Sequence, residues 1–183
     1  LRASLGSAFR APDFNELYYP GFEIAPGLFM FAGNPDLDPE RSVTAEAGLD
    51  WTPQARSHVG LSLYRTRVQD LIVFGGDLFD AMNIDRANID GAELEFATGF
   101  GNLNLHGNLN WLDARNRDTG EALLRRAPRK AHASVDYTFA NGAVLGLDGD
   151  GVAARPDKNF DAFPAEDISL GGYGLLHLRA MLP

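Results

Sequence analysis

The chain is dominated by segments in which apolar and polar residues alternate one by one. In the clearest segment, Val43, Ala45, Ala47, Leu49 and Trp51 alternate with Thr44, Glu46, Gly48 and Asp50. The same alternation recurs around Leu61, Leu94, Leu105 and Val135. A period of two puts successive side chains of an extended strand on opposite faces. The pattern therefore predicts strands with one apolar face and one polar face.

Eight strands are predicted, and the connections between them alternate between short and long. The strands are expected at about 1–10, 42–51, 58–74, 89–99, 102–115, 129–140, 143–156 and 168–182. Short turns rich in Gly, Asn or Pro are expected at 52–57, 99–102 and 141–143. Long loops are expected at 11–41, 75–88, 116–128 and about 157–167. This asymmetry favours an all-β fold, part of an antiparallel up-and-down transmembrane β-barrel with extracellular long loops.

The barrel interpretation assigns a direction to each face. We expect the apolar positions to face lipid, among them Val43, Leu61, Leu94, Leu105 and Val135. We expect the polar positions to face the lumen, among them Glu46, Glu95, Asn108 and Asp136. The aromatic residues beside the short turns would form a periplasmic girdle, and they are Trp51, Phe100 and Phe139.

Composition narrows the alternatives. The chain has 183 residues, no Cys and a formal net charge of -9, which excludes disulfides and argues against a general nucleic-acid binder. A soluble β-sandwich adhesin would also alternate, but it would not need so many carboxylates and amides on one face. A barrel enzyme such as a lipase would need a Ser/His/acid set, and no GxSxG motif occurs. The four His residues fall in four different predicted strands: His58, His106, His132 and His177.

Several motifs resemble a known family. The segment FRAPDFNELY at 9–18 is followed by GNPDLDPE at 33–40, and this ordered pair resembles TonB-dependent transporters of the bacterial outer membrane. Within that family, later segments resemble the vitamin B12 (cobalamin) receptors. These segments are YRTRVQDL at 64–71, NIDGAE at 88–93, LDARN at 112–116, LLRRAP at 123–128 and GGY at 171–173.

The resemblance implies an organisation and a function. Residues 1–183 would be part of one receptor β-barrel domain, about eight strands of an implied 22, with a plug domain and final strands outside this chain. The function implied is active transport of a chelated nutrient, cobalamin first, energised by the TonB complex through the plug. A siderophore or haem receptor is the alternative. The protein would not be an enzyme, and it would lie in the outer membrane of a Gram-negative bacterium, in contact with lipids and lipopolysaccharide.

Candidate ligand contacts fall in the long loops. The resemblance carries Arg125 over as a substrate contact, and Phe160 falls where the family places a substrate-contacting Tyr. Arg125 belongs to a basic cluster that also contains Arg126, Arg129 and Lys130, in which planar guanidinium groups suit anionic or amide-rich ligands. Five aromatic residues of the first long loop offer an aromatic platform: Tyr18, Tyr19, Phe22, Phe29 and Phe31. The alternatives are contacts to lipid phosphates for the Arg cluster, and self-packing of the loop or an aromatic girdle for the aromatic residues.

Two oxygen-rich runs resemble calcium loops. The first is Asn34, Asp36, Asp38 and Glu40, but Pro35 and Pro39 favour a stiff turn that enters a strand. The second is Asp148-Gly149-Asp150-Gly151, where the period of two puts both Asp residues on the polar face. We therefore expect no metal site and no cofactor in this segment. The resemblance implies calcium only in extracellular loops of earlier strands.

Overall fold

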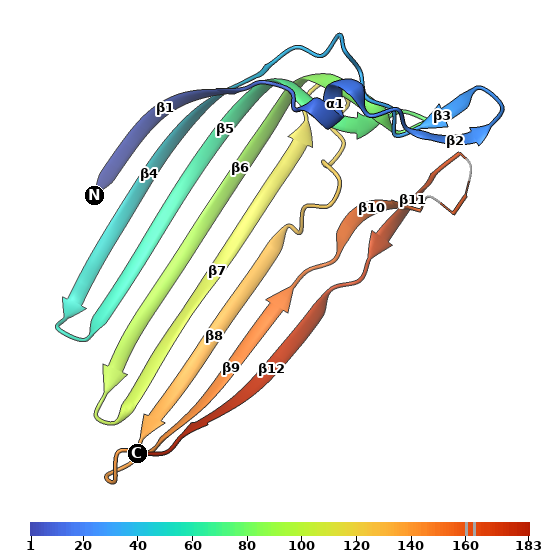
Figure 1. Cartoon of the computed structure of the whole chain (residues 1–183). Helices are drawn as coiled ribbons and strands as arrows, with labels where there is room; N and C mark the ends of the chain where they lie inside the picture. Colours follow the sequence, from blue (N-terminus) through green and yellow to red (C-terminus); the bar gives the residue numbers. More distant parts are fainter. Residues whose placement is uncertain (160, 163) are drawn as a thin grey trace.

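The eight predicted strands form one continuous antiparallel sheet. The computed structural model describes residues 1–159, 161, 162 and 164–183. The sheet has the order β1-β4-β5-β6-β7-β8-β9-β12, in which each strand pairs with its neighbour along the chain, apart from two small hairpins (Figure 1). Its strands are Arg2–Arg10 (β1), Glu40–Gln54 (β4), Ser57–Gly75 (β5), Asp80–Phe100 (β6), Leu103–Asn116 (β7), Arg129–Thr138 (β8), Val144–Val152 (β9) and Tyr173–Met181 (β12).

The remaining elements lie at the end of the sheet where the connections are long, which we call the long-loop end. A short helix, α1, spans Phe14–Tyr18, and the hairpin β2–β3 spans Phe22–Ala25 and Leu28–Met30. A second hairpin, β10–β11, spans Arg155–Asn159 and Glu166–Leu170. The opposite end, with its tight turns, is called the short-turn end (Figure 1). In the described part of the chain, no helix is long and apolar enough to cross a membrane.

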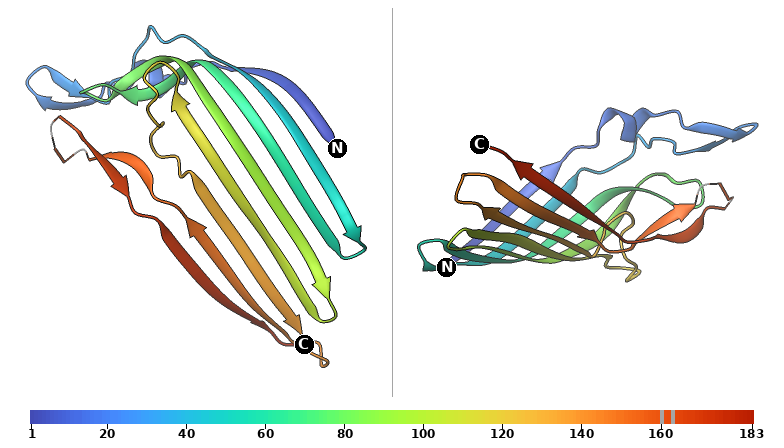
Figure 2. Two further views of the ribbon diagram at one scale, coloured as in Figure 1. Left: turned by 180° about the vertical axis from the view of Figure 1, so that it is seen from behind. Right: turned by 90° about the horizontal axis from the view of Figure 1, so that it is seen from below.

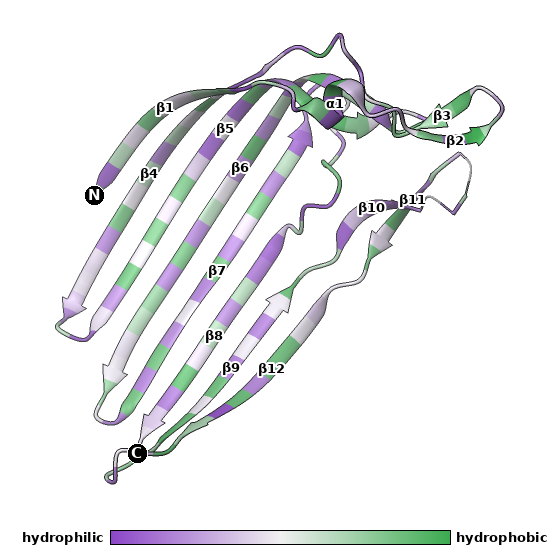
Figure 3. Cartoon of the chain, in the orientation of Figure 1, coloured by the Kyte–Doolittle hydropathy of each residue, from purple (hydrophilic) through white to green (hydrophobic). Residues whose placement is uncertain are grey.

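The strand register confirms the predicted division into two faces. Directly paired residues share a face in an antiparallel sheet. On one face, Leu61 pairs with Leu94 and Leu94 with Leu109. On the other, Gly60 pairs with Glu95 and Glu95 with Asn108. We call these the apolar face and the polar face. The alternation is visible along every strand of the sheet, which curves into an open trough (Figures 2 and 3).

The apolar face changes character partway along the strands. Near the short-turn end it carries exposed apolar side chains, such as Trp51, Phe100 and Leu147. Toward the long-loop end the same face becomes charged: Arg65 pairs with Asp90, and their side chains form an ion pair at 2.5 Å. A membrane-spanning strand needs only about 9–11 residues, so the long β5 and β6 extend well past an apolar belt of that height. The long-loop end therefore extends beyond the apolar belt, where its surface is exposed to water.

Two predicted loops were wrong. Residues 75–88, expected to be a loop, are mostly strand, because β5 and β6 remain paired up to Gly75 and Asp80 and leave only a four-residue turn. The region 157–167 contains part of each strand of the β10–β11 hairpin, so the two strands predicted at 143–156 and 168–182 are each divided in two. Beyond the apolar belt both strand faces meet water or protein, and the simple alternation on which the prediction rested no longer holds.

The first long loop, 11–39, is more ordered than predicted. Asp13 caps α1: its side chain accepts a hydrogen bond from the Glu16 backbone N–H, and the Glu16 side chain accepts one from the Asp13 N–H. This is a capping box, and its D-x-x-E spacing could have been found in the sequence.

Two buried clusters hold the long-loop end together. One contains Val68, Leu71, Ala87, Ala114 and Leu123, and the other contains Leu37, Ile72 and Ala81.

Candidate functional site

A row of aromatic rings lies at the long-loop end. Tyr19 contacts Phe22 with ring centroids 5.7 Å apart, Phe22 contacts Phe31 at 6.4 Å, and Phe31 contacts Phe79 at 5.6 Å. All three pairs meet edge to face, the arrangement that the ring quadrupole favours. The structure thus brings together two of the predicted residues, Tyr19 and Phe22. Tyr18 instead packs on Phe14 within α1, at 5.3 Å.

Phe79, the innermost ring of this aromatic row, was missed by the sequence analysis, which included Phe31. Phe79 lies at the tip of the β5–β6 hairpin, and its position follows only from the pairing of two long strands. Phe31 and Phe79 both have positive φ, at 58° and 56°. That backbone region costs a non-Gly residue of order 1–3 kcal/mol and is concentrated at ligand clamps and other functional sites. The Phe31 N–H donates to the Leu78 carbonyl at 3.0 Å, which helps to hold the two segments in register.

Arg10 ties the aromatic loop to the sheet. Its guanidinium donates to both carboxylate oxygens of Glu16 in α1, at 2.9 and 3.0 Å. It also donates to both carboxylate oxygens of Glu40 at the start of β4, at 2.8 and 2.9 Å. The backbone N–H of Ile72 donates to Glu40 as well, at 2.8 Å. Burial acts to raise the pKa of Glu40, but the hydrogen bonds from Arg10 and Ile72 outweigh it and leave the pKa lowered.

Arg125 lies in the loop between β7 and β8 and contacts the β10–β11 hairpin. Its Nε donates to Asp157 at 3.0 Å, and its backbone N–H donates to the Pro156 carbonyl at 2.8 Å. The hydrogen bond from the Lys158 backbone N–H, and then the Arg125 guanidinium, lower the pKa of Asp157. Arg125 has φ 62°, so it too is held in a strained backbone conformation. The loop therefore presents this guanidinium in a defined place, about half exposed.

The rest of the predicted basic cluster is dispersed. Arg126 donates to the Leu124 carbonyl at 3.1 Å, within its own loop. Arg129 pairs with Trp111 on the apolar face, whereas Lys130 pairs with Asn110 on the polar face. Phe160, the remaining predicted contact, lies outside the described residues. The ligand roles of Arg125, Arg126, Phe160, Tyr18, Tyr19 and Phe22 stay predictions.

The two oxygen-rich runs lie as the sequence suggested. Asn34 Oδ1 accepts from the Asp36 backbone N–H at 2.9 Å, which closes a turn, and Glu40 is engaged by Arg10. Asp148 and Asp150 both lie on the polar face, where they pair with Ser134 and His132. Neither run belongs to a group with metal-ligand spacing among the described residues.

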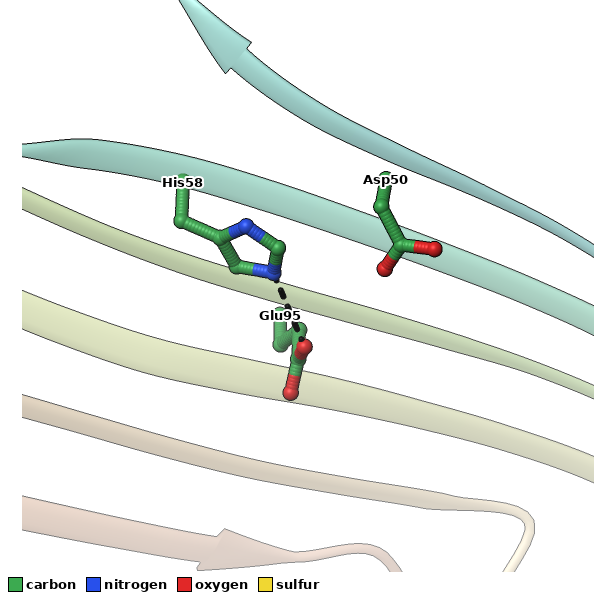
Figure 4. Close-up of side chains that lie close together, drawn as sticks. All are labelled: Asp50, His58 and Glu95. Atoms are coloured by element: carbon green, nitrogen blue, oxygen red, sulfur yellow. Dashed lines mark hydrogen bonds and ion pairs between the residues drawn. The ribbon is translucent and has the colours of Figure 1, made fainter. Parts of the chain in front are cut away.

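The polar face carries all four His residues, one each on β5, β7, β8 and β12. His132 Nδ1 lies 2.9 Å from Asp150 Oδ1, and His58 Nε2 lies 3.1 Å from Glu95 Oε1. Asp50, on β4, completes a group with His58 and Glu95 in which one ligand atom from each lies within 4.8 Å of the others (Figure 4). The sequence analysis missed this group because its members are distant in the chain.

The sequence is similar to a known transporter. Over 178 aligned residues it is 32% identical to the vitamin B12 transporter BtuB of Vibrio vulnificus, an alignment that covers 91% of this chain and 26% of that protein. The chain thus spans about a quarter of the length of this curated relative.

The fold is similar to several solved outer-membrane proteins. The copper transporter OprC matches with a TM-score of 0.75 and 24% identity, over 97% of this chain and 27% of that one. The siderophore receptor PirA from Acinetobacter baumannii matches with a TM-score of 0.72 and 17% identity, over 97% of this chain and 32% of that one. The ferric enterobactin receptor PfeA from Pseudomonas aeruginosa matches with a TM-score of 0.72 and 18% identity, over 96% and 29%. At these identities the likeness establishes the fold alone.

The family described as TonB dependent receptor-like, beta-barrel, matches residues 1–180. Its members are β-barrel receptors and transporters of the Gram-negative outer membrane and not enzymes, in agreement with the expected location and class. With an apolar face, a polar face and an up-and-down sheet already evident in its structure, the chain belongs to the TonB-dependent receptor β-barrel family.

Proposed function

We propose that the protein containing this chain imports cobalamin across the outer membrane, with energy from the TonB complex. The observation that carries the proposal is the 32% identity to a vitamin B12 transporter, extending over 91% of this chain. The strands would form barrel wall, with the polar face toward the lumen and the long-loop end outside the cell. Binding and passage require no covalent step, and the described polar groups suit non-covalent contacts.

The long-loop end offers suitable chemistry for a large, amide-rich ligand. The exposed part of the aromatic row, at Tyr19 and Phe22, supplies rigid contact surface that loses little entropy when a ligand binds, and the buried Phe79 supports the row from beneath through Phe31. Arg125 supplies a planar donor that can pair with a phosphate or amide oxygen of a corrinoid, and its link to Asp157 orients it. In this proposal ligand binds these loops and the plug, TonB pulls the plug, and ligand passes along the polar face.

The outward-facing surface above the apolar belt suits lipopolysaccharide. It carries the ion pairs Arg65–Asp90 and Arg115–Asp113, and Arg86 is paired with Asp118. Guanidinium groups in this band can exchange a carboxylate partner for a lipid phosphate of similar geometry. We include this lipid contact in the proposed function as part of anchoring the barrel.

The direct test is ligand binding by the full-length protein. We expect cyanocobalamin to bind the purified receptor in detergent, measured by isothermal titration calorimetry, and ferric siderophores and haem to give no heat of binding. Uptake of labelled cobalamin by cells that carry the gene should require TonB. Tight binding of a ferric siderophore or haem, without binding of cobalamin, would refute the assignment.

Arg125 gives a sharper test at the level of one residue. We expect Arg125→Ala to weaken cobalamin binding about 10- to 150-fold, the worth of one charge-assisted hydrogen bond. Arg129→Ala is the matched control, because Arg129 lies on the apolar face and should leave affinity unchanged. Heat-modifiable gel mobility should be the same for both variants and the parent. Unchanged affinity in Arg125→Ala would assign the guanidinium to lipopolysaccharide or to loop structure.

A siderophore receptor is the second candidate. It is favoured by the likeness in fold to PirA and PfeA, whose names give a siderophore and ferric enterobactin as ligands. Against it, the sequence identity to these proteins is below 20%, and many TonB-dependent receptors share the barrel. The calorimetric comparison above separates the two candidates.

A further inference from the structure

Three side chains with metal-binding atoms converge on the polar face near the short-turn end. Asp50 lies on β4, His58 on β5 and Glu95 on β6, and Figure 4 shows all three on the same side of the sheet. One ligand atom from each lies within 4.8 Å of the others. The three residues come from three adjacent strands, so a rigid hydrogen-bonded backbone fixes their relative positions.

The strand register explains the convergence. Asp50 pairs with Gly60, and Gly60 pairs with Glu95, so the two carboxylates flank one glycine. A Cβ at position 60 would lie 2.8 Å from both Cγ and Oε1 of Glu95. The missing side chain therefore lets Glu95 lie across β5 toward Asp50. His58 is two residues from Gly60 on the same strand, so its imidazole points to the same face.

We propose that Asp50, His58 and Glu95 bind a divalent transition-metal ion of the Zn²⁺ type. One imidazole nitrogen and two carboxylate oxygens are ligands that Zn²⁺ accepts, with a fourth position left to water. An imidazole ligand disfavours Ca²⁺ and Mg²⁺, which prefer oxygen ligands alone. His58 Nε2 is now 3.1 Å from Glu95 Oε1, and a bound ion would sit between these atoms and Asp50. This site is independent of the proposed cobalamin transport.

Arg2 is the group that opposes a cation here. Its Nη1 lies 3.0 and 2.9 Å from the two oxygens of Asp50, and its Nε lies 3.5 Å from Glu46. Each Asp50 oxygen has a second lone pair, so the carboxylate can accept from Arg2 and ligate an ion together. Two further carboxylates, Glu46 and Glu93, lie beside the site and offset the charge of Arg2: Glu46 contacts Arg2, and Glu93 lines a cavity of about 350 Å³ together with Arg2, Gly60 and Glu95. The local charge is therefore negative.

The test uses the full-length protein, purified in detergent and stripped of metal with a chelator. Titration with Zn²⁺ should show a site with a stoichiometry of one that His58→Gln and Glu95→Gln each weaken at least about 10-fold. The matched control is His132→Gln, which removes another His of the polar face that is hydrogen-bonded to a carboxylate, and it should leave that site unchanged. Arg2→Gln should tighten binding about 5-fold, because it removes a positive charge near the ion.

Two further readouts make the outcome unambiguous. Co²⁺ bound at the site should give visible absorption bands that disappear in His58→Gln and remain in His132→Gln. Gel mobility of every variant should match that of the parent, which separates a lost site from a misfolded barrel. The proposal is overturned if Zn²⁺ does not bind, if His58→Gln and His132→Gln have equal effects, or if Arg2→Gln weakens binding. Cobalamin binding should be the same in all these variants, so failure here leaves the transport proposal intact.

Discussion

All eleven buried hydrophobic residues among the described part of the chain lie at the long-loop end, whereas the short-turn half of the same sheet contributes none of them. At the long-loop end, Ile72 of β5 packs against Leu37, which lies in the long loop that follows β1. At the short-turn half, side chains such as Trp51 and Leu109 are about half exposed. The same pair of strands, β5 and β6, passes through both regions.

The difference reflects two solvents. In water, apolar side chains must be covered by protein, so the long-loop end builds a small core from loops and strand ends. In the membrane, lipid covers the apolar face, and the requirement is instead that every backbone N–H and C=O be paired, which the sheet provides. A substitution should therefore have effects that depend on which of the two regions it falls in.

The largest expected effect is on the core of the long-loop end. Ile72→Ala should destabilise the packing of residues 11–39 on the sheet by about 2–5 kcal/mol, since it leaves a cavity against Leu37 and Ala81. Hydrogen exchange in this segment should rise, while heat-modifiable mobility of the barrel stays unchanged. Leu109→Ala, on the apolar face, should cost less because lipid chains can fill the space. Equal effects of the two substitutions would contradict the two-solvent comparison.

Val135 tests the membrane half. Val135 pairs with Leu105 and Leu147 on the apolar face, and Val135→Lys should lower the free energy of unfolding by about 2–4 kcal/mol if the site lies near the bilayer midplane. Urea unfolding of the full-length protein in lipid vesicles measures this. Ser134→Lys, one residue away but on the polar face opposite Asp148, should cost far less. A larger cost at Ser134 would reverse the assignment of the faces.

Glu40 tests the link between the first long loop and the sheet. Glu40→Gln removes the charge that Arg10 and the Ile72 N–H share, and should destabilise the loop by about 1 kcal/mol, because the pair is partly exposed. Protease cleavage within residues 11–39 should become faster. The control Glu23→Gln changes a carboxylate that only closes its own hairpin, by accepting from the Gly27 N–H, and should have no effect on cleavage.

A smaller and more general effect is expected from acid. The pKa values of Glu40 and Asp157 are both lowered in the folded protein. Each carboxylate therefore contributes stability that is complete above its ordinary pKa, 4.5 for Glu40 and 3.8 for Asp157, and that is lost as the pH falls through the lowered pKa. Acid should therefore loosen the long loops first, and an acid-active protease should cleave them before it cleaves the rest of the chain. Equally early cleavage in the short-turn half at the same pH would contradict this prediction.

The sequence predicted the membrane half better than the aqueous half. All eight long strands were predicted, because lipid on one side and polar groups on the other impose a strict period of two on segments such as 43–51. Past the apolar belt that constraint disappears, and the continuation of β5 and β6 through 75–88 was missed. The helix α1 was too short to show a helical period.

The candidate sites divide in the same manner. Arg125, Phe22 and Phe31 were predicted as candidates from local composition and family resemblance. The structure adds Asp157 as the partner of Arg125 and Phe79 as a partner of Phe31. The group of Asp50, His58 and Glu95 could not be identified in this way. Its members lie up to 45 residues apart in the sequence, and only the register through Gly60 brings them together.

With the long-loop end outside the cell, as proposed above, the tip of the β5–β6 hairpin also affects where a foreign peptide could be displayed on the cell surface. A tip at the end of two long strands would be the obvious place for an epitope tag, but Phe79 is buried there and the Leu78 carbonyl is bonded to Phe31. An insertion after Asp77 would disrupt the packing of Phe79 and the hydrogen bond between Leu78 and Phe31. The turn at Thr119 and Gly120 is exposed and should accept a tag with the receptor still correctly assembled.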